Sequence, residues 1–473
     1  MGTHDLQAPA GPKGPDSSEG EPFTVVNPAT GEPFAEAADC GPAELDAVVA
    51  RARAAWPAWR SDPAARSAAL SAAADAAETV ADDLAVLLTR EQGKPLAEAR
   101  SEVSRLAARL RYFAALVPRT RDVGDGRAGV RSQLRWQSVG PVAAIVPWNF
   151  PLQLASSKIA PALAAGNTVV LKPSPLTPLA TRLLGNVLSG VLPPGVLTVV
   201  TGRDPLGARL ATHPGIRQVT FTGSVATGRL VAEAAAAQLR PVTLELGGND
   251  AAIVLDDVDL DALGPRLFWS AFRNCGQVCM AVKRVYAPAG RYAEVVEALA
   301  EQARSVVIGD GLDEATQLGP LNNPQQLGIV ERFVDEAVAR GAKPAVGGHR
   351  VDRPGYFYAP TVLTDVPPDS AVVTEEQFGP VLPVLPYDDL DEAVAAANAT
   401  EYGLGGSVWG TDLDRAEAVA ERLECGTVWL NHHAELSLAQ PFAGTKDSGL
   451  GVAGGPWGLY GNLRPLVVHR PER

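Results

Sequence analysis

Cysteine is scarce in this chain, and long runs of apolar residues are missing. The 473 residues include four cysteines, at positions 40, 275, 279 and 425. Four cysteines in so long a chain do not build a disulfide framework, so we expect a reducing, cytoplasmic location. No apolar stretch approaches the roughly 20 residues that cross a bilayer, which predicts no membrane span. A functionally important cysteine here is therefore expected to act through its reactivity.

Positive charge is also in short supply. The chain has 41 Lys and Arg against 54 Asp and Glu, a formal net charge of −13. No basic stripe is visible, which excludes a nucleic-acid surface. With 46% hydrophobic and 20% charged residues, the composition is that of a globular protein of two or three packed units. Residues 1–20, rich in Pro, Gly and Ser, lack the pattern of a signal peptide and are expected to form a disordered leader.

Helices and short β-rich runs alternate through the first half of the chain. Helical periodicity over residues 42–116 is followed, after Gly140, by apolar runs such as 142–146 and 218–222 that are separated by helical segments. This alternation predicts an α/β fold with a doubly wound, mostly parallel sheet, whose ligands bind at the carboxyl ends of the strands. We assign residues 21–118 and 139–246 to a dinucleotide-binding domain.

The second half repeats the α/β pattern and ends in an extended tail. Residues 247–440 are expected to form a catalytic α/β domain. Residues 119–138 alternate polar and apolar side chains, as an exposed β-ribbon does. The extended tail can pair with this ribbon, so we assign 119–138 and 455–473 to an oligomerisation arm.

Several motifs follow predicted strands, where such a fold places its site. In chain order they are Pro147-Trp-Asn-Phe-Pro151, Lys172-Pro-Ser174, Phe221-Thr-Gly-Ser224 with Gly228, Glu245-Leu-Gly-Gly248, Gly276-Gln-Val-Cys279, Glu376-Gln-Phe-Gly-Pro380 and Pro441-Phe-Ala-Gly444. In this order and spacing, from about Pro22 onward, the chain resembles the aldehyde dehydrogenase superfamily. The resemblance implies oxidation of an aldehyde to a carboxylic acid with NAD(P)⁺.

Cys279 is the expected nucleophile. A thiolate attacks an aldehyde carbon directly to give a thiohemiacetal, and we expect a nearby cation or dipole to favour that thiolate. An inert buried cysteine is the alternative, but the Gly276-Gln277 context and the upstream Glu245 favour catalysis. Cys275 is expected to pack in the core, and a metal site at the two cysteines lacks further ligands.

Three further residues are expected to take part in the reaction. By resemblance, Glu245 deprotonates the water that hydrolyses the thioester, Asn149 donates to the oxyanion together with the Cys279 N–H, and Lys158 assists proton relay near the glutamate. Their alternatives are a strand-end carboxylate, a turn residue and a solvated helix lysine. Because relatives that transfer the acyl group to coenzyme A typically lack this glutamate, Glu245 favours the free acid.

The cofactor motif departs from the common dinucleotide fingerprint. Gly223 to Gly228 is not a full G-x-G-x-x-G, but a strand end that opens into a helix can still hold a pyrophosphate. By resemblance, Lys172 contacts the adenosine ribose and Glu376 the nicotinamide ribose. The full set of expected cofactor-binding residues is Ile145, Pro147, Trp148, Lys172, Ser174, Pro175, Gly223, Ser224, Gly228, Leu246, Glu376 and Phe378.

Cofactor preference depends on Pro175. NAD-preferring relatives commonly carry a glutamate at this position, three residues after the lysine, and its loss weakens repulsion of a 2′-phosphate. No arginine stands in the segment to receive that phosphate. We therefore expect NAD, with NADP possible.

A mainly apolar pocket is expected around the nucleophile, and it suits an uncharged aldehyde. Its residues are Phe150, Ser157, Arg273, Val278, Met280, Leu436 and Phe442. Arg273 stands where semialdehyde dehydrogenases place an arginine for the substrate carboxylate, but their second arginine falls at Ser157. A carboxylated substrate is therefore the alternative, and an ion pair explains Arg273 equally well.

Two other functions stay open at this point: acyl transfer to coenzyme A or phosphate, and a non-enzymatic protein that kept the fold. Intact Cys279, Glu245 and Asn149 disfavour both. The expected partners are a small-molecule aldehyde and further copies of the chain in a homodimer or homotetramer.

Overall fold

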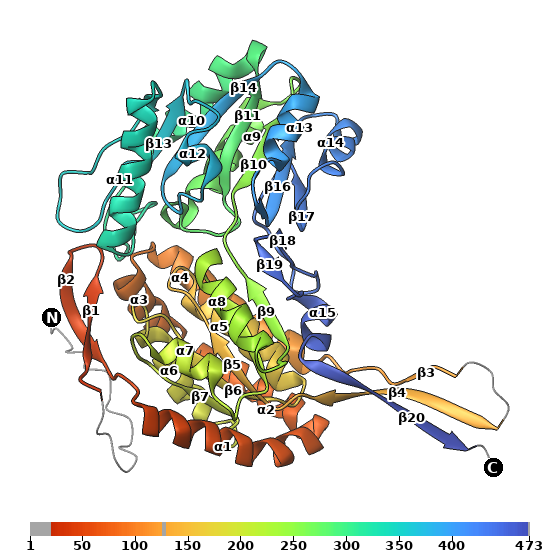
Figure 1. Cartoon of the computed structure of the whole chain (residues 1–473). Helices are drawn as coiled ribbons and strands as arrows, with labels where there is room; N and C mark the ends of the chain where they lie inside the picture. Colours follow the sequence, from red (N-terminus) through yellow and green to blue (C-terminus); the bar gives the residue numbers. More distant parts are fainter. Residues whose placement is uncertain (1–19, 125–128, 472–473) are drawn as a thin grey trace.

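The computed structural model describes residues 20–124 and 129–471 and shows two α/β domains with a projecting ribbon (Figure 1). The first domain contains a six-stranded sheet in the order β19-β9-β8-β5-β6-β7. Its strands are β5 (Pro141–Ile145), β6 (Thr168–Lys172), β7 (Leu197–Val199), β8 (Gln218–Thr222), β9 (Val242–Glu245) and β19 (Gly449–Leu450). All pairings are parallel except that of β19 with β9.

Helices cover both faces of this sheet, as a doubly wound fold requires. They are α1 (Pro42–Ser61), α2 (Pro63–Thr79), α3 (Ala81–Gln92), α4 (Leu96–Ala114), α5 (Pro151–Ala164), α6 (Leu179–Ser189), α7 (Leu206–Thr212) and α8 (Val225–Ala236). Along β5, Val142 and Ala144 pack with α2 to α6, whereas Ala143 and Ile145 pack with α1, α7 and α8. Because successive strand side chains point to opposite faces, a wholly apolar strand places one core on each side.

The second domain holds a seven-stranded sheet in the order β12-β13-β14-β11-β10-β16-β17, in which only β12 is antiparallel. Its strands are β10 (Asp250–Val254), β11 (Val282–Pro288), β12 (Lys343–Val346), β13 (Thr361–Thr364), β14 (Val381–Tyr387), β16 (Gly405–Trp409) and β17 (Thr427–Leu430). Its helices are α9 (Leu260–Phe272), α10 (Tyr292–Ser305), α11 (Pro324–Ala339), α12 (Ala371–Thr374), α13 (Leu390–Asn398) and α14 (Leu413–Ala420), with a 3₁₀ turn η1 (Arg273–Gly276) before the cysteine motif.

Two of the elements that sequence periodicity missed in this domain contain proline. β14 is an interior strand although it contains Pro383 and Pro386, and proline normally argues against an interior strand because it has no N–H to donate. α9 continues through Gly264-Pro265, a pair that usually marks a loop. In both cases burial of the surrounding apolar side chains outweighs the local signal.

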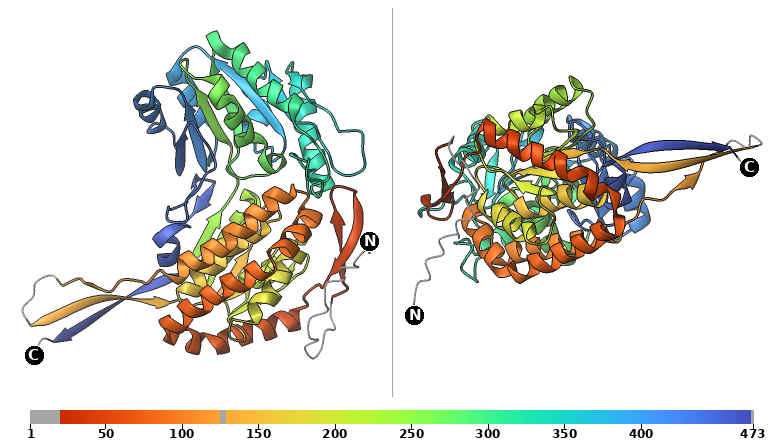
Figure 2. Two further views of the ribbon diagram at one scale, coloured as in Figure 1. Left: turned by 180° about the vertical axis from the view of Figure 1, so that it is seen from behind. Right: turned by 90° about the horizontal axis from the view of Figure 1, so that it is seen from below.

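The ribbon forms as predicted, with a correction at its end. The tail strand β20 (Leu463–Pro471) pairs antiparallel with β4 (Val130–Ser138), and β3 (Arg121–Asp122) lies on the other side of β4. Figure 2 shows this sheet extending away from the body of the protein. Residues 455–460 are not part of the arm, because they form helix α15 (Gly455–Tyr460), which packs against α5.

Two short β-structures complete the fold. β1 (Phe23–Asn27) and β2 (Glu32–Ala37) form a hairpin beside the first domain, and β15 (Tyr402–Gly403) pairs with β18 (Thr445–Lys446). Residues 445–450, which form β18 and β19, lead the chain from the second domain back to the sheet of the first domain. The predicted leader lies almost wholly outside the described residues. Within the described ranges, no helix is long and apolar enough to cross a membrane, and no cluster of side chains suits a metal ion.

Candidate active site

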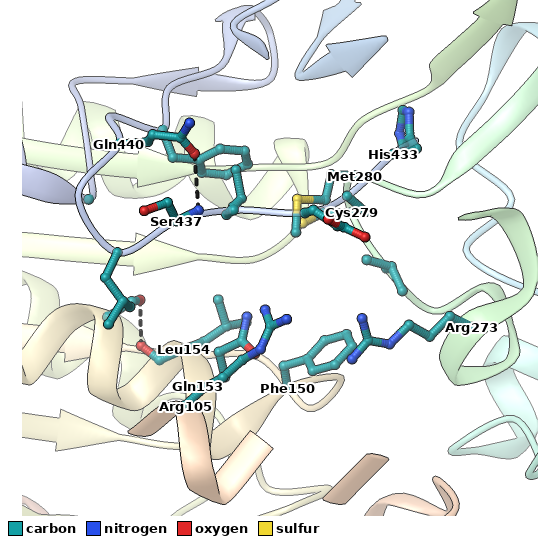
Figure 3. A pocket seen from close by; sticks show the side chains of 18 of the residues that line it. Arg105, Phe150, Gln153, Leu154, Arg273, Cys279, Met280, His433, Ser437 and Gln440 are labelled. Atoms are coloured by element: carbon teal, nitrogen blue, oxygen red, sulfur yellow. Dashed lines mark hydrogen bonds between the residues drawn. The ribbon is translucent and has the colours of Figure 1, made fainter. Parts of the chain in front are cut away.

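A cavity of about 1020 Å³ lies between the two domains (Figure 3). Helix α4 and the start of α5 form one wall, and the cysteine loop and residues 430–442 of the second domain form another. Cys279, Glu245 and Asn149 all line it. Three segments that are far apart in sequence therefore bring the predicted catalytic side chains to one space.

The loop that carries Cys279 has a constrained backbone. Asn274 and Cys275 adopt positive φ angles of 51° and 57°, and Gly276 follows at +70°, where an added Cβ would lie 2.1 Å from the Gly379 carbonyl oxygen. Lys283 fixes the other end of the loop, since its Nζ donates to the carbonyl oxygens of Val278 (2.8 Å) and Cys279 (3.1 Å). Only glycine fits at 276, which explains this part of the motif.

The thiol of Cys279 does not have the lowered pKa that we expected. Burial raises its pKa to about 12, and the nearby Lys283 cation offsets this only in part, because the carboxylates of Glu376, Glu245 and Asp250 raise it further. The expected cation is therefore present, but desolvation of the charged form outweighs it. In this state the sulfur is a thiol, and its proton must leave as the attack proceeds.

Glu245 is a buried carboxylate with two side-chain partners. It ends β9 opposite Thr222 of β8. Its Oε2 accepts from Thr222 Oγ1 at 2.8 Å and from Lys158 Nζ at 2.5 Å. Burial alone would raise its pKa, but the Lys158 charge and these hydrogen bonds outweigh burial and leave the pKa below its usual value. Lys158 is thus a buried ion-pair partner of Glu245, which excludes the alternative of a solvated helix lysine.

Asn149 follows β5 and is 3% exposed. Its Nδ2 donates to the Gln277 carbonyl oxygen at 2.9 Å, which ties it to the cysteine loop. The backbone oxygen of Asn149 accepts from Lys94 Nζ (2.8 Å) and Asn274 Nδ2 (3.1 Å). The amide has two N–H bonds, so one remains for an oxyanion.

Sequence reasoning missed the pair that supports Asn149. Lys94 Nζ lies 2.6 Å from Glu102 Oε2, and both side chains are at most 1% exposed. Glu102 Oε1 accepts from the backbone N–H groups of Leu152 (2.8 Å) and Gln153 (2.9 Å) at the start of α5, and Lys94 also lies 3.7 Å above the Phe150 ring. The backbone groups that this pair binds, at residues 149, 152 and 153, lie at least 50 residues away in sequence. Sequence spacing therefore could not reveal the role of the pair.

The predicted cofactor residues gather at the carboxyl edge of the first sheet. Ile145 pairs in register with Lys172 of β6 and with Phe221 of β8, and Ser224 caps α8 by accepting from the Thr227 N–H at 3.3 Å. A Cβ added at Gly228 would lie 2.5 Å from Leu246 Cδ2. Glycine at 228 therefore lets the start of α8 pack closely against the Leu246 side chain. Ser224 at the N-terminus of α8 is exposed, so a phosphate can reach the free N–H groups there.

Three further predicted cofactor residues, Trp148, Glu376 and Phe378, contact other parts of the protein. Glu376 Oε1 accepts from the Gly248 N–H at 3.2 Å and lies 3.4 Å from Lys283 Nζ. Burial raises the pKa of Glu376. Trp148 and Phe378 pack edge to face at 5.4 Å. Contact of any of these residues with a nucleotide stays a prediction.

All seven predicted substrate residues line the cavity: Phe150, Ser157, Arg273, Val278, Met280, Leu436 and Phe442. The prediction missed three more arginines on its wall, Arg105, Arg109 and Arg266. Arg109 donates to the Gln153 carbonyl oxygen (2.8 Å) and to Ser156 Oγ (2.7 Å). Arg105 and Arg109 are four residues apart on α4, so they lie on the same face of the helix. This spacing is the sequence feature from which their common location could have been predicted.

Arg273 has only a weak internal partner. Its Nε lies 3.9 Å from Glu98 Oε2, and its side chain is 37% exposed. A pair of that length at a partly exposed site contributes little stability. The ion-pair explanation of Arg273 is therefore weaker than the sequence suggested.

Known proteins resemble this chain over nearly its whole length. The model of the aldehyde dehydrogenase family matches residues 15–465. The chain belongs to the aldehyde dehydrogenase family. A probable succinate-semialdehyde dehydrogenase [NADP(+)] of Sinorhizobium fredii is 41% identical over 94% of this chain and 92% of its own length. A geranial dehydrogenase of Castellaniella defragrans is 43% identical over 91% and 92%.

Solved structures of aldehyde dehydrogenases share the whole fold. An aldehyde dehydrogenase of Brucella melitensis superposes with a TM-score of 0.94 at 35% identity, over 97% of this chain and 95% of its own. Both domains of this aldehyde dehydrogenase are therefore family features, and the chain catalyses NAD(P)-dependent oxidation of an aldehyde.

Proposed function

We propose that Cys279 is the nucleophile of this aldehyde dehydrogenase. Its sulfur adds to the aldehyde carbon as the thiol S–H bond breaks and its proton passes to water, while the carbonyl oxygen becomes an oxyanion bound by the free Asn149 N–H and the Cys279 N–H. The observation that carries the proposal is the convergence of Cys279, Glu245 and Asn149 on one cavity. The chemistry that NAD(P)⁺ would supply when bound is acceptance of a hydride, and loss of that hydride would convert the thiohemiacetal on Cys279 to a thioester.

Glu245 completes the reaction as the general base. It takes a proton from a water molecule, whose oxygen attacks the thioester carbon and releases the acid and the Cys279 thiol. The Lys158 ion pair and the Thr222 hydrogen bond keep this carboxylate ionised at neutral pH. An ionised buried base beside the cysteine supports hydrolysis over acyl transfer to coenzyme A.

For the cofactor, we propose NAD with acceptance of NADP. The capped N-terminus of α8 and the close Gly228–Leu246 contact fit a pyrophosphate. Pro175 places no carboxylate near a 2′-phosphate. Relatives support both forms, because the S. fredii protein is named for NADP(+) and a Bacillus cereus neighbour was solved with NAD⁺.

For the substrate, we propose an aldehyde that carries a carboxylate. Arg273 lines the cavity with its guanidinium largely unengaged, and several relatives are named as succinate- or glutarate-semialdehyde dehydrogenases. The geranial dehydrogenase shows that a similar chain also serves an apolar aldehyde. The positive charge of Arg273 in the cavity favours aldehydes that carry a carboxylate.

We further propose that the β3-β4-β20 ribbon is an oligomerisation arm of a cytoplasmic homodimer or homotetramer. Val130, Leu466 and Val467 expose 42%, 37% and 47% of their surface on the ribbon, as a surface that a second copy covers would do. All four cysteines are free, which supports a reducing compartment.

Replacement of Cys279 tests the central assignment. We expect Cys279→Ala to lower aldehyde-dependent reduction of the cofactor by about 10⁴-fold or more while cofactor binding persists. Cys425→Ala is the matched control, because Cys425 lies outside the cavity. Wild-type turnover in Cys279→Ala would exclude the cysteine mechanism.

A further inference from the structure

Two arginines reach the same part of the cavity from different domains. Arg105 comes from α4 of the first domain, and Arg273 comes from the 3₁₀ turn that precedes the cysteine loop. Figure 3 shows both side chains directed into the cavity near Phe150. The Arg273 charge lowers the pKa of Arg105, in addition to the larger effect of burial, so the two guanidinium groups interact electrostatically.

Among the described residues, neither cation has a close ion-pair partner. Among residues 20–124 and 129–471, none forms a hydrogen bond or ion pair with the Arg105 guanidinium. Arg273 has only the 3.9 Å contact from Nε, and its partner Glu98 also accepts from the Asn274 N–H at 3.3 Å. The remaining acid on this wall, Glu435, is exposed and acts on Arg105 only at a distance.

Two like charges held together in a partly desolvated space repel each other. A bound anion removes this repulsion and gains charge-assisted hydrogen bonds from both guanidinium groups. A carboxylate suits the arrangement because its two oxygens match the planar donor fork of arginine. The pair therefore has the character of an anion receptor.

Position 157 explains why α4 can supply the second arginine. The resemblance to semialdehyde dehydrogenases assigns that arginine to α5, where this chain has Ser157. The Ser157 hydroxyl donates to the Leu154 carbonyl oxygen at 2.8 Å within its own helix. It is small and satisfied, so it leaves the cavity open to a side chain from α4.

We propose that Arg105 and Arg273 together form a carboxylate clamp, with Arg105 as the specificity-determining residue that replaces the arginine missing at 157. The clamp binds the terminal carboxylate of an aliphatic aldehyde whose carbonyl carbon meets Cys279, and apolar residues such as Phe150 and Phe442 contact the chain between them. This inference rests on the proposed function.

The test compares two aldehydes of equal length, succinate semialdehyde and butanal, on wild type, Arg105→Gln, Arg105→Lys and Arg266→Gln. We expect Arg105→Gln to lower kcat/KM for the semialdehyde by about 10- to 100-fold, mainly through KM, with butanal changed less than about twofold. Lysine should restore part of the loss because it keeps the charge but not the fork. Arg266→Gln is the matched control, because Arg266 is an exposed arginine that lines the same cavity from α9.

A binding measurement separates recognition from chemistry. Calorimetric titration with succinate, which has the carboxylate but no aldehyde, should show weaker binding to Arg105→Gln by a similar factor. Equal losses for both aldehydes, or no loss for the semialdehyde, would overturn the clamp. Because butanal oxidation requires Cys279 and not Arg105, a wild-type enzyme that oxidises butanal through Cys279 without preferring the semialdehyde refutes the clamp and the carboxylated substrate proposed above, and leaves the proposed cysteine mechanism standing. Oxidation that persists without Cys279 refutes the proposed function.

Discussion

Two regions of the active site differ in how their charges are satisfied: an inner end of buried charges around Glu245 and Asn149, and an outer end of partly or fully exposed charges that comprises Arg105, Arg266, Arg273 and Glu435. At the inner end, the buried charges of Glu245 and Lys158 are paired at 2.5 Å, and those of Lys94 and Glu102 at 2.6 Å. At the outer end, Arg105 forms no hydrogen bond or ion pair with the described residues, and Arg273 has one contact at 3.9 Å. The inner end is fixed for a reaction common to all aldehydes, whereas the outer end is free to select among them.

The difference has an energetic consequence. A charge buried without a partner costs several kcal/mol, so the inner groups must be paired for the fold to persist. A partly exposed cation keeps much of its hydration, so it can remain without a protein partner until a ligand binds. Substitutions at the inner end should therefore affect every substrate or the fold itself, and those at the outer end only the choice of substrate.

The largest effect is expected at the Lys94–Glu102 pair. Lys94→Met leaves the Glu102 carboxylate buried without its cation, which should lower the free energy of unfolding by about 3–5 kcal/mol. Urea denaturation measures this change. Arg266→Met removes an exposed outer-end cation and should change stability by about 0.5 kcal/mol or less. Equal losses in both variants would show that the two ends do not differ in this way.

The next effect concerns the oxyanion donor. Asn149→Ala should lower kcat by about 10²- to 10³-fold, because one donor to the developing oxyanion is lost. Steady-state kinetics on butanal and succinate semialdehyde should give the same factor, in contrast to Arg105→Gln. A factor that depends on the substrate carboxylate would place Asn149 in recognition.

The smallest effect is a pH dependence at Cys279. With a thiol pKa raised to about 12 by burial, the thiolate fraction of the cofactor-free enzyme should grow tenfold for each pH unit between 7 and 10. Alkylation by iodoacetamide, corrected with Cys279→Ala for the other cysteines, should rise accordingly without a plateau. A plateau near pH 8 or 9 would mean that burial does not control this thiol.

Much of the fold follows from local sequence signals. The apolar strands of the first sheet, the ribbon and the motifs at the strand ends were predicted because periodicity and motif order are local. β14 and α9 were missed because Pro383, Pro386 and Pro265 oppose the local pattern and tertiary burial overrides them.

The residues of the site likewise divide into those that the sequence predicts and those that only the structure reveals. Cys279, Glu245 and Asn149 were found from motifs and the seven pocket residues from their positions in the family resemblance, and all of them line the cavity. Lys94, Glu102 and Arg105 carry no motif, and their importance depends on neighbours that only the fold brings near. The raised pKa of Cys279 could not be predicted either, since it depends on how much water the folded loop excludes.

The acyl-enzyme formed by Glu245→Gln tests the account most directly. Rapid mixing of this variant with NAD⁺ and succinate semialdehyde should release close to one equivalent of reduced cofactor per site, followed by turnover about 10²- to 10⁴-fold slower than wild type. Mass spectrometry should then find the acyl group on the Cys279 peptide. Glu435→Gln, at the exposed outer end, should behave as wild type. A variant at Glu245 with no burst and unchanged steady-state turnover would contradict the account.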